Sequence, residues 1–92
     1  MPRTVLTAEG ILSWVNEWIR NQDTSGVCEG VVVSGPVVRL EAANADGANW
    51  ARDLPLRGAR SIECAMIAVE AISMAQRKLS LEMPDVRNGV AL

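Results

Sequence analysis

The chain has 92 residues, of which 49% are hydrophobic, and a formal net charge of −2 from nine basic and eleven acidic side chains. This length is typical of a single domain, 1–92, with a modest core, and the apolar content is too high for a disordered segment. Because phosphate neutralisation supplies much of the affinity of nucleic-acid-binding proteins, a chain without a basic excess is not expected to bind nucleic acid directly.

The sequence lacks the residue patterns on which common enzyme chemistries depend. It contains no His, so the commonest general base is missing, and its two Cys cannot provide the four Cys or His ligands of an ordinary zinc site. The glycines form neither a GxGxxG nor a GxxxxGK[ST] pattern that could hold phosphates. We therefore expect a protein that is not an enzyme and that binds neither a cofactor nor a metal.

Cys28 and Cys64 lie far apart in the chain, in different predicted elements. A disulfide is conceivable, but two buried free thiols are the favoured interpretation, because cytosolic proteins rarely hold disulfides. The N-terminal stretch MPRTVLTAEG has no apolar core of a secretory signal, and no run of about 18 uncharged apolar residues could span a membrane. The expected location is the cytoplasm.

The N-terminal third predicts an amphipathic helix over 8–21. Thr7 is a suitable N-cap, and Leu6 could pack on Ile11 as a hydrophobic staple. The apolar face consists of Ile11, Leu12, Trp14, Val15, Trp18 and Ile19, and the polar face of Glu9, Ser13, Asn16, Glu17 and Arg20. The polar run 22–26, with its terminal Gly, is expected to end this helix.

Three short segments, 27–33, 37–43 and 48–54, are then predicted as strands joined by turns at 34–36 and 44–47. A breaker-free segment follows and predicts a long helix over 59–83, which Pro84 ends, leaving 85–92 as a flexible tail. The expected fold class is therefore α+β, a two-layer sandwich in the order helix, three-stranded antiparallel meander, helix.

The predicted long helix has one broad aliphatic side and one mixed side. The aliphatic side comprises Cys64, Ala65, Ala68, Val69, Ala71, Ile72, Ala75 and Leu79. The mixed side carries Glu63, Glu70 and Arg77, with Met66, Ile67 and Met74 among them. These apolar side chains are covered by the first helix or the tail, or else they form a partner surface, such as a homodimer contact, since Met is common at interaction surfaces.

Three arginines, Arg52, Arg57 and Arg60, lie just before and at the start of this helix. Such a group beside a helix N-terminus could contact an anion. Alternatively, these side chains are solvated or paired with Asp53 and Glu63.

The predicted element order resembles that of a double-stranded-RNA-binding domain over nearly the whole chain. That family contacts phosphates from a lysine cluster that opens its last helix. Here the sequence Gly-Ala-Arg-Ser-Ile-Glu occupies this place at 58–63, so only Arg57 and Arg60 correspond. The resemblance implies a nucleic-acid-binding module as one alternative.

The profile of size, charge and missing catalytic residues also resembles the small phage-encoded anti-CRISPR proteins, without any shared motif. This resemblance implies a non-enzymatic inhibitor that binds a host protein or ribonucleoprotein complex in the bacterial cytoplasm and blocks nucleic-acid binding or nuclease recruitment. The partner-binding residues are then predicted to be Arg52, Arg57, Arg60, Glu63, Met66, Ile67, Glu70, Met74 and Arg77. A homodimeric accessory subunit is the remaining alternative.

Overall fold

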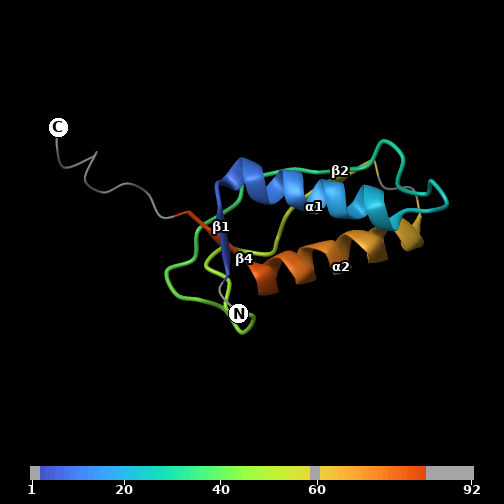
Figure 1. Ribbon diagram of the computed structural model, residues 1–92. Helices are drawn as coiled ribbons and strands as arrows, with labels where there is room; N and C mark the ends of the chain where they lie inside the picture. Colours follow the sequence, from blue (N-terminus) through green and yellow to red (C-terminus); the bar gives the residue numbers. More distant parts are fainter. Residues whose placement is uncertain (1–2, 59–60, 83–92) are drawn as a thin grey trace.

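The computed structural model describes residues 3–58 and 61–82, and contains two helices and four short strands. The chain begins with strand β1 (Thr4–Leu6) and helix α1 (Ala8–Gln22). Strands β2 (Val32–Val33) and β3 (Leu56–Arg57) follow, then helix α2 (Ile62–Lys78) and strand β4 (Leu79–Leu81). The two helices lie side by side and run in opposite directions (Figure 1).

Helix α1 forms as the sequence predicts and ends one residue later than expected. The Thr7 hydroxyl accepts a hydrogen bond from the backbone N–H of Gly10 at 3.0 Å, so Thr7 is the N-cap. Ile11, Val15 and Ile19 are buried along one side of the helix, as its amphipathic pattern indicated.

Helix α2 is shorter at its C-terminal end than predicted. Ser61 caps its N-terminus by accepting a hydrogen bond from the N–H of Cys64, but the helix ends at Lys78 and the chain becomes extended at Leu79. The prediction that Pro84 ends the helix is therefore wrong, while the predicted residues 59–60 and the tail 85–92 lie outside the described part of the chain. Ala75 and Leu79 are four residues apart and both are buried, so the helical spacing of buried residues continues to Leu79 although the backbone is no longer helical there.

The chain leaves the helix because β4 pairs in parallel with β1, with Thr4 opposite Leu79 and Leu6 opposite Leu81. Leu79 and Leu81 point into the core from this strand, and the N–H of Glu82 extends the pairing to the carbonyl of Leu6 at 2.8 Å. The two partners are separated by more than 70 residues. No local sequence signal indicates such a pairing.

The guanidinium of Arg3 caps the C-terminus of α2, where backbone carbonyls lack helical partners. It donates to the carbonyls of Gln76, of Arg77 at 2.8 Å and of Leu79 at 2.6 Å, and to the Ser80 hydroxyl at 2.8 Å. A cation at this position is also favoured by the helix dipole. Arg3 thereby joins the start of the chain to the end of α2.

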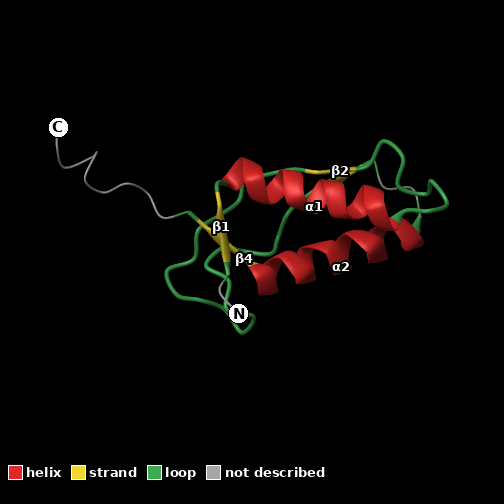
Figure 2. Ribbon diagram, viewed as in Figure 1, coloured by secondary structure: helices red, strands yellow, loops and turns green. Residues whose placement is uncertain are grey.

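The predicted three-stranded meander does not form, and the strands belong to two separate two-stranded sheets (Figure 2). Residues 27–30 make a turn, and only Val32–Val33 of the first predicted strand is extended, paired antiparallel with β3. The second and third predicted strands form no regular ladder: they pair antiparallel at one bridge, Arg39 opposite Trp50, where the N–H of Leu40 donates to the carbonyl of Asn49 at 2.9 Å and the N–H of Ala51 to that of Val38 at 2.7 Å. The resulting architecture is a small α+β fold, and the topology of a double-stranded-RNA-binding domain, which requires the meander, is not present.

Amide side chains replace much of the missing sheet pairing. The Asn16 amide exchanges two hydrogen bonds with the backbone of Val33, at 2.8 and 2.9 Å, and Asn49 does the same with Leu81, at 2.7 and 2.9 Å. Asn16 was predicted on the solvent face of its helix, so this prediction is wrong. Because Asn16 satisfies both backbone groups of Val33, it occupies the edge that a third strand would have used.

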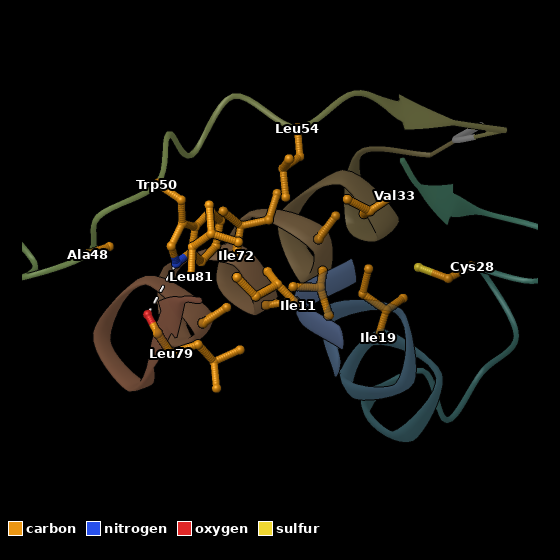
Figure 3. Packing of buried hydrophobic residues seen from close by; sticks show 14 of the residues in the cluster. Ile11, Ile19, Cys28, Val33, Ala48, Trp50, Leu54, Ile72, Leu79 and Leu81 are labelled. Carbon is orange, nitrogen blue, oxygen red and sulfur yellow. Dashed lines mark hydrogen bonds between the residues drawn. The ribbon is translucent and has the colours of Figure 1, made fainter. Parts of the chain in front are cut away.

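The core lies between the two helices and beneath the segment 34–55 (Figure 3). Trp50 is fully buried, and its indole N–H donates to the carbonyl of Leu79 at 3.1 Å. Among the described residues, Gln76 is the only polar one that is fully buried. Its amide N–H donates to the Trp50 carbonyl at 2.9 Å, and its amide oxygen accepts from the Asn44 amide. These bonds satisfy its polar atoms, so Gln76 ties α2 to the segment 44–50.

Cys28 and Cys64 form a disulfide, with their Cα atoms 5.2 Å apart, so the interpretation as two free thiols is wrong. The Asp23 carboxylate positions Cys28 because it accepts the N–H groups of Val27 and Cys28 at 2.9 and 2.8 Å. Cys64 belongs to the first turn of α2. The disulfide therefore connects the turn after α1 to the start of α2, a proximity that the sequence does not reveal.

Candidate functional site: the outer face of α2

Three large apolar side chains project into solvent from α2. Ile62 is 81% exposed, Met66 66% and Val69 58%. They are spaced four and three residues apart, so they form one stripe along the helix. Together with Ala65, Glu70, Ser73 and Arg77 they line a shallow groove, which we call the α2 groove.

The rotation of α2 about its axis determines which side chains reach this groove. The buried side comprises Cys64, Ala68, Ala71, Ile72, Ala75 and Gln76. Its alanines allow close approach to α1, while Gln76 is drawn inward by its bonds to the segment 44–50. Val69, predicted on the inner side, is thereby left at the solvent edge, and that prediction is wrong.

The residues predicted on the mixed side of this helix divide into two groups. Glu63, Met66, Glu70 and Arg77 are exposed, as predicted. Ile67 and Met74 are half-buried, and Ile67 packs against the core cluster. The apolar part of the face is therefore formed by Ile62, Met66 and Val69 rather than by Met66, Ile67 and Met74.

The predicted arginine cluster is not a single feature. Arg52 donates to the Ser73 hydroxyl at 2.9 Å and so lies against the C-terminal half of the α2 groove. Arg57 is exposed on β3, opposite Val32, and does not belong to the groove lining. Arg60 falls outside the described residues. Arg77 lies one helical turn after Ser73 and lines the same groove, so Arg52 and Arg77, rather than Arg52 and Arg57, form its basic end.

The charges of the groove have no oppositely charged partner within the described part of the chain. Among residues 3–58 and 61–82, neither Glu70 nor Arg77 has a side-chain ion-pair partner, and the only bond of the Arg52 guanidinium is to a neutral hydroxyl. The groove therefore carries an apolar N-terminal half, followed by an acidic and then a basic position. Sequence inspection could have found Ile62 and Val69, because they share the seven-residue spacing of Glu63 and Glu70.

A second hollow lies between the end of α1 and the segment 26–32. It has a volume of about 430 Å³ and includes Arg20, Asp23 and Glu29 in its lining. The Asp23 carboxylate is already occupied by two backbone N–H groups. In the part of the chain that the structure describes, no group of three or more Cys, Asp or Glu side chains is arranged to hold a metal ion.

Neither α1 nor α2 has the length and apolarity required to cross a membrane. Comparisons with protein-family models, with curated proteins and with solved structures found no match to this chain.

Proposed function

We propose that this protein is a non-enzymatic binding module whose contact surface is the α2 groove. The observation that carries the proposal is the exposed stripe of Ile62, Met66 and Val69. Residues packed only for stability are rarely this exposed in a contiguous apolar row, and Met and Arg are enriched at the centres of protein interfaces. The charges of Glu70 and Arg77, which have no ion-pair partner among residues 3–58 and 61–82, would then orient the partner.

For the partner, we propose a CRISPR ribonucleoprotein of a bacterial host, which this protein inhibits by blocking nucleic-acid binding or nuclease recruitment. Support for this class comes from the chain's profile: a small acidic domain without the residue patterns of common catalytic sites and with a mixed apolar and charged face on α2. Direct contact with nucleic acid is not part of the proposal, because the net charge is −2.

The proposed site of action is the bacterial cytoplasm, where thiols are kept reduced. The Cys28–Cys64 disulfide weighs against that compartment, because proteins in a reducing compartment rarely hold disulfides. Both cysteines are buried, and the bond holds the start of α2. An inhibitor acting in the cytoplasm must therefore keep its α2 groove in the dithiol form. Binding by the reduced protein is accordingly part of the test.

The test compares two valine substitutions of similar exposure. Val69→Glu places a charge in the α2 groove, whereas Val38→Glu places one at a site that is 52% exposed and outside the groove. Purified CRISPR effector complexes are assayed for target binding and cleavage with each variant, oxidised and reduced. We expect inhibition by the wild-type protein and Val38→Glu, and loss of inhibition with Val69→Glu.

Inhibition that survives Val69→Glu and Met66→Glu together would refute the α2 groove as the contact surface. Failure of the wild-type protein to inhibit any complex in the panel would refute the proposed partner class. A homodimeric accessory subunit is supported instead if light scattering shows a dimer that Val69→Glu, but not Val38→Glu, converts to a monomer.

A further inference from the structure

The arrangement of charges in the α2 groove restricts what can occupy it. We infer, on the basis of the proposed function, that the groove takes an amphipathic helix of another protein whose contacting stripe reads apolar, basic, acidic. The apolar residues would lie against Ile62, Met66 and Val69, the base against Glu70, and the acid beside Arg52 and Arg77.

The shape of the groove favours a helix as the occupant. Its lining residues extend along α2 from Ile62 to Arg77, about 22 Å at the rise of an α-helix. The apolar residues recur at spacings of four and three along this face, so a helix laid along it could place its own apolar stripe against them. A partner helix of roughly 15 residues would span this length.

The basic end of the groove provides a defined place for a carboxylate. The hydroxyl of Ser73 holds the Arg52 guanidinium through one N–H at 2.9 Å, and a guanidinium has five N–H donors, so most of them remain available. Arg77 lies one helical turn beyond Ser73, on the same lining. A carboxylate near Ser73 would therefore meet the guanidinium of Arg52, and that of Arg77 one turn further along the groove.

A second copy of this chain does not satisfy the same arrangement. If two α2 helices pack antiparallel with Met66 against Met66, then Glu70 faces Ile62, and Arg77 lies beyond the start of the other helix. If Glu70 is placed against Arg77 instead, Ile62 lies beyond the other helix's end at Lys78. In a parallel pair in register, like charges meet at the same level. The asymmetric order of the groove therefore fits a different chain.

The experiment selects binders from a displayed library of 16-residue helical peptides with one randomised face, using the oxidised wild-type protein as bait. Enriched peptides are then measured against four variants: Met66→Glu, Arg52→Glu with Arg77→Glu, Glu70→Lys and the control Val38→Glu. We expect enriched peptides to carry apolar residues at helical spacing, followed on the same face by a Lys or Arg and then by an Asp or Glu, the acid two to three turns from the apolar residues.

The expected affinity of these peptides falls about tenfold or more for Met66→Glu and for the double arginine variant, falls by a smaller factor for the single charge reversal Glu70→Lys, and is unchanged for Val38→Glu. Raising the salt concentration should weaken binding to the wild-type protein more than to the double arginine variant.

Enriched peptides that depend on Met66 but carry no acid, or that tolerate reversal of both arginines, would overturn this inference and leave the groove as a contact surface. Peptides indifferent to Met66→Glu would overturn the proposed contact surface itself. If no peptide is enriched, the groove does not take a helix and the inference is wrong, whereas the inhibition assay still decides the proposed function.

Discussion

Reduction of the Cys28–Cys64 disulfide should remove a large share of the stability of this protein. The two cysteines are 36 residues apart, and closing a loop of that length lowers the entropy of the unfolded chain by an amount worth about 4 kcal/mol at 25 °C. A domain of this size typically has a free energy of unfolding of roughly 5–14 kcal/mol. The reduced protein is therefore expected to retain its fold with much less reserve.

The measurement is urea unfolding of the oxidised and the fully reduced protein, followed by tryptophan fluorescence. With a slope of roughly 1–2 kcal/mol per molar urea, the midpoint should fall by about 2–4 M on reduction. The double variant Cys28→Ala, Cys64→Ala is the control: it should match the reduced protein and should not respond to reductant. A midpoint change below about 0.5 M, or alkylation of both thiols in the untreated folded protein, would refute this reasoning.

Three further substitutions test the contacts that hold the fold. Arg3→Ala should lower the free energy of unfolding by about 1.5–3 kcal/mol, because charged hydrogen bonds to the end of α2 are lost. Arg3→Lys should restore only part of this loss. Equal urea midpoints for the wild-type protein and both variants would contradict the capping role. Gln76→Ala should lower the melting temperature by about 10–20 °C, because the carbonyl of Trp50 and the Asn44 amide lose their buried partner. A fall of less than about 3 °C in the melting temperature would show that water replaces the side chain. Asn16→Ala should accelerate hydrogen exchange at the Val33 amide at least about tenfold, while exchange within α1 changes less. If the Val33 amide is protected as before, another group accepts its N–H.

The two helices were predictable because their signals are local. The Thr7 cap and the regular spacing of Ile11, Val15 and Ile19 act within one or two turns, where residues close in the sequence make the contacts, whereas the cap at Ser61 was not predicted. The exposure of Met66 followed from the same periodicity. What periodicity could not provide was the exact rotation of α2, which a buried Gln76 and an exposed Val69 reveal.

The middle of the chain was misread because β-branched residues do not specify their partner. Val31, Val32 and Val33 have the composition of a strand, but Val33 pairs with Leu56 on one side and with the Asn16 side chain on the other. Because both sides of Val33 are occupied, no further strand could pair with it to make the predicted sheet. The candidate site was affected in the same way, since the placement of Arg52 at Ser73 depends on the path of the segment before β3.

The sequence by itself determined the two amphipathic helices, the Thr7 N-cap of the first and the absence of the residues that common catalytic sites require. Tertiary structure alone decided the β1–β4 pair, the amide bridges to Val33 and Leu81, the Cys28–Cys64 disulfide and the bonds of Gln76 that set the rotation of α2. The physical reason is one of range. Helical hydrogen bonds join residues four apart, whereas each of these other contacts joins groups 17 or more residues apart and forms only when the chain has brought them together.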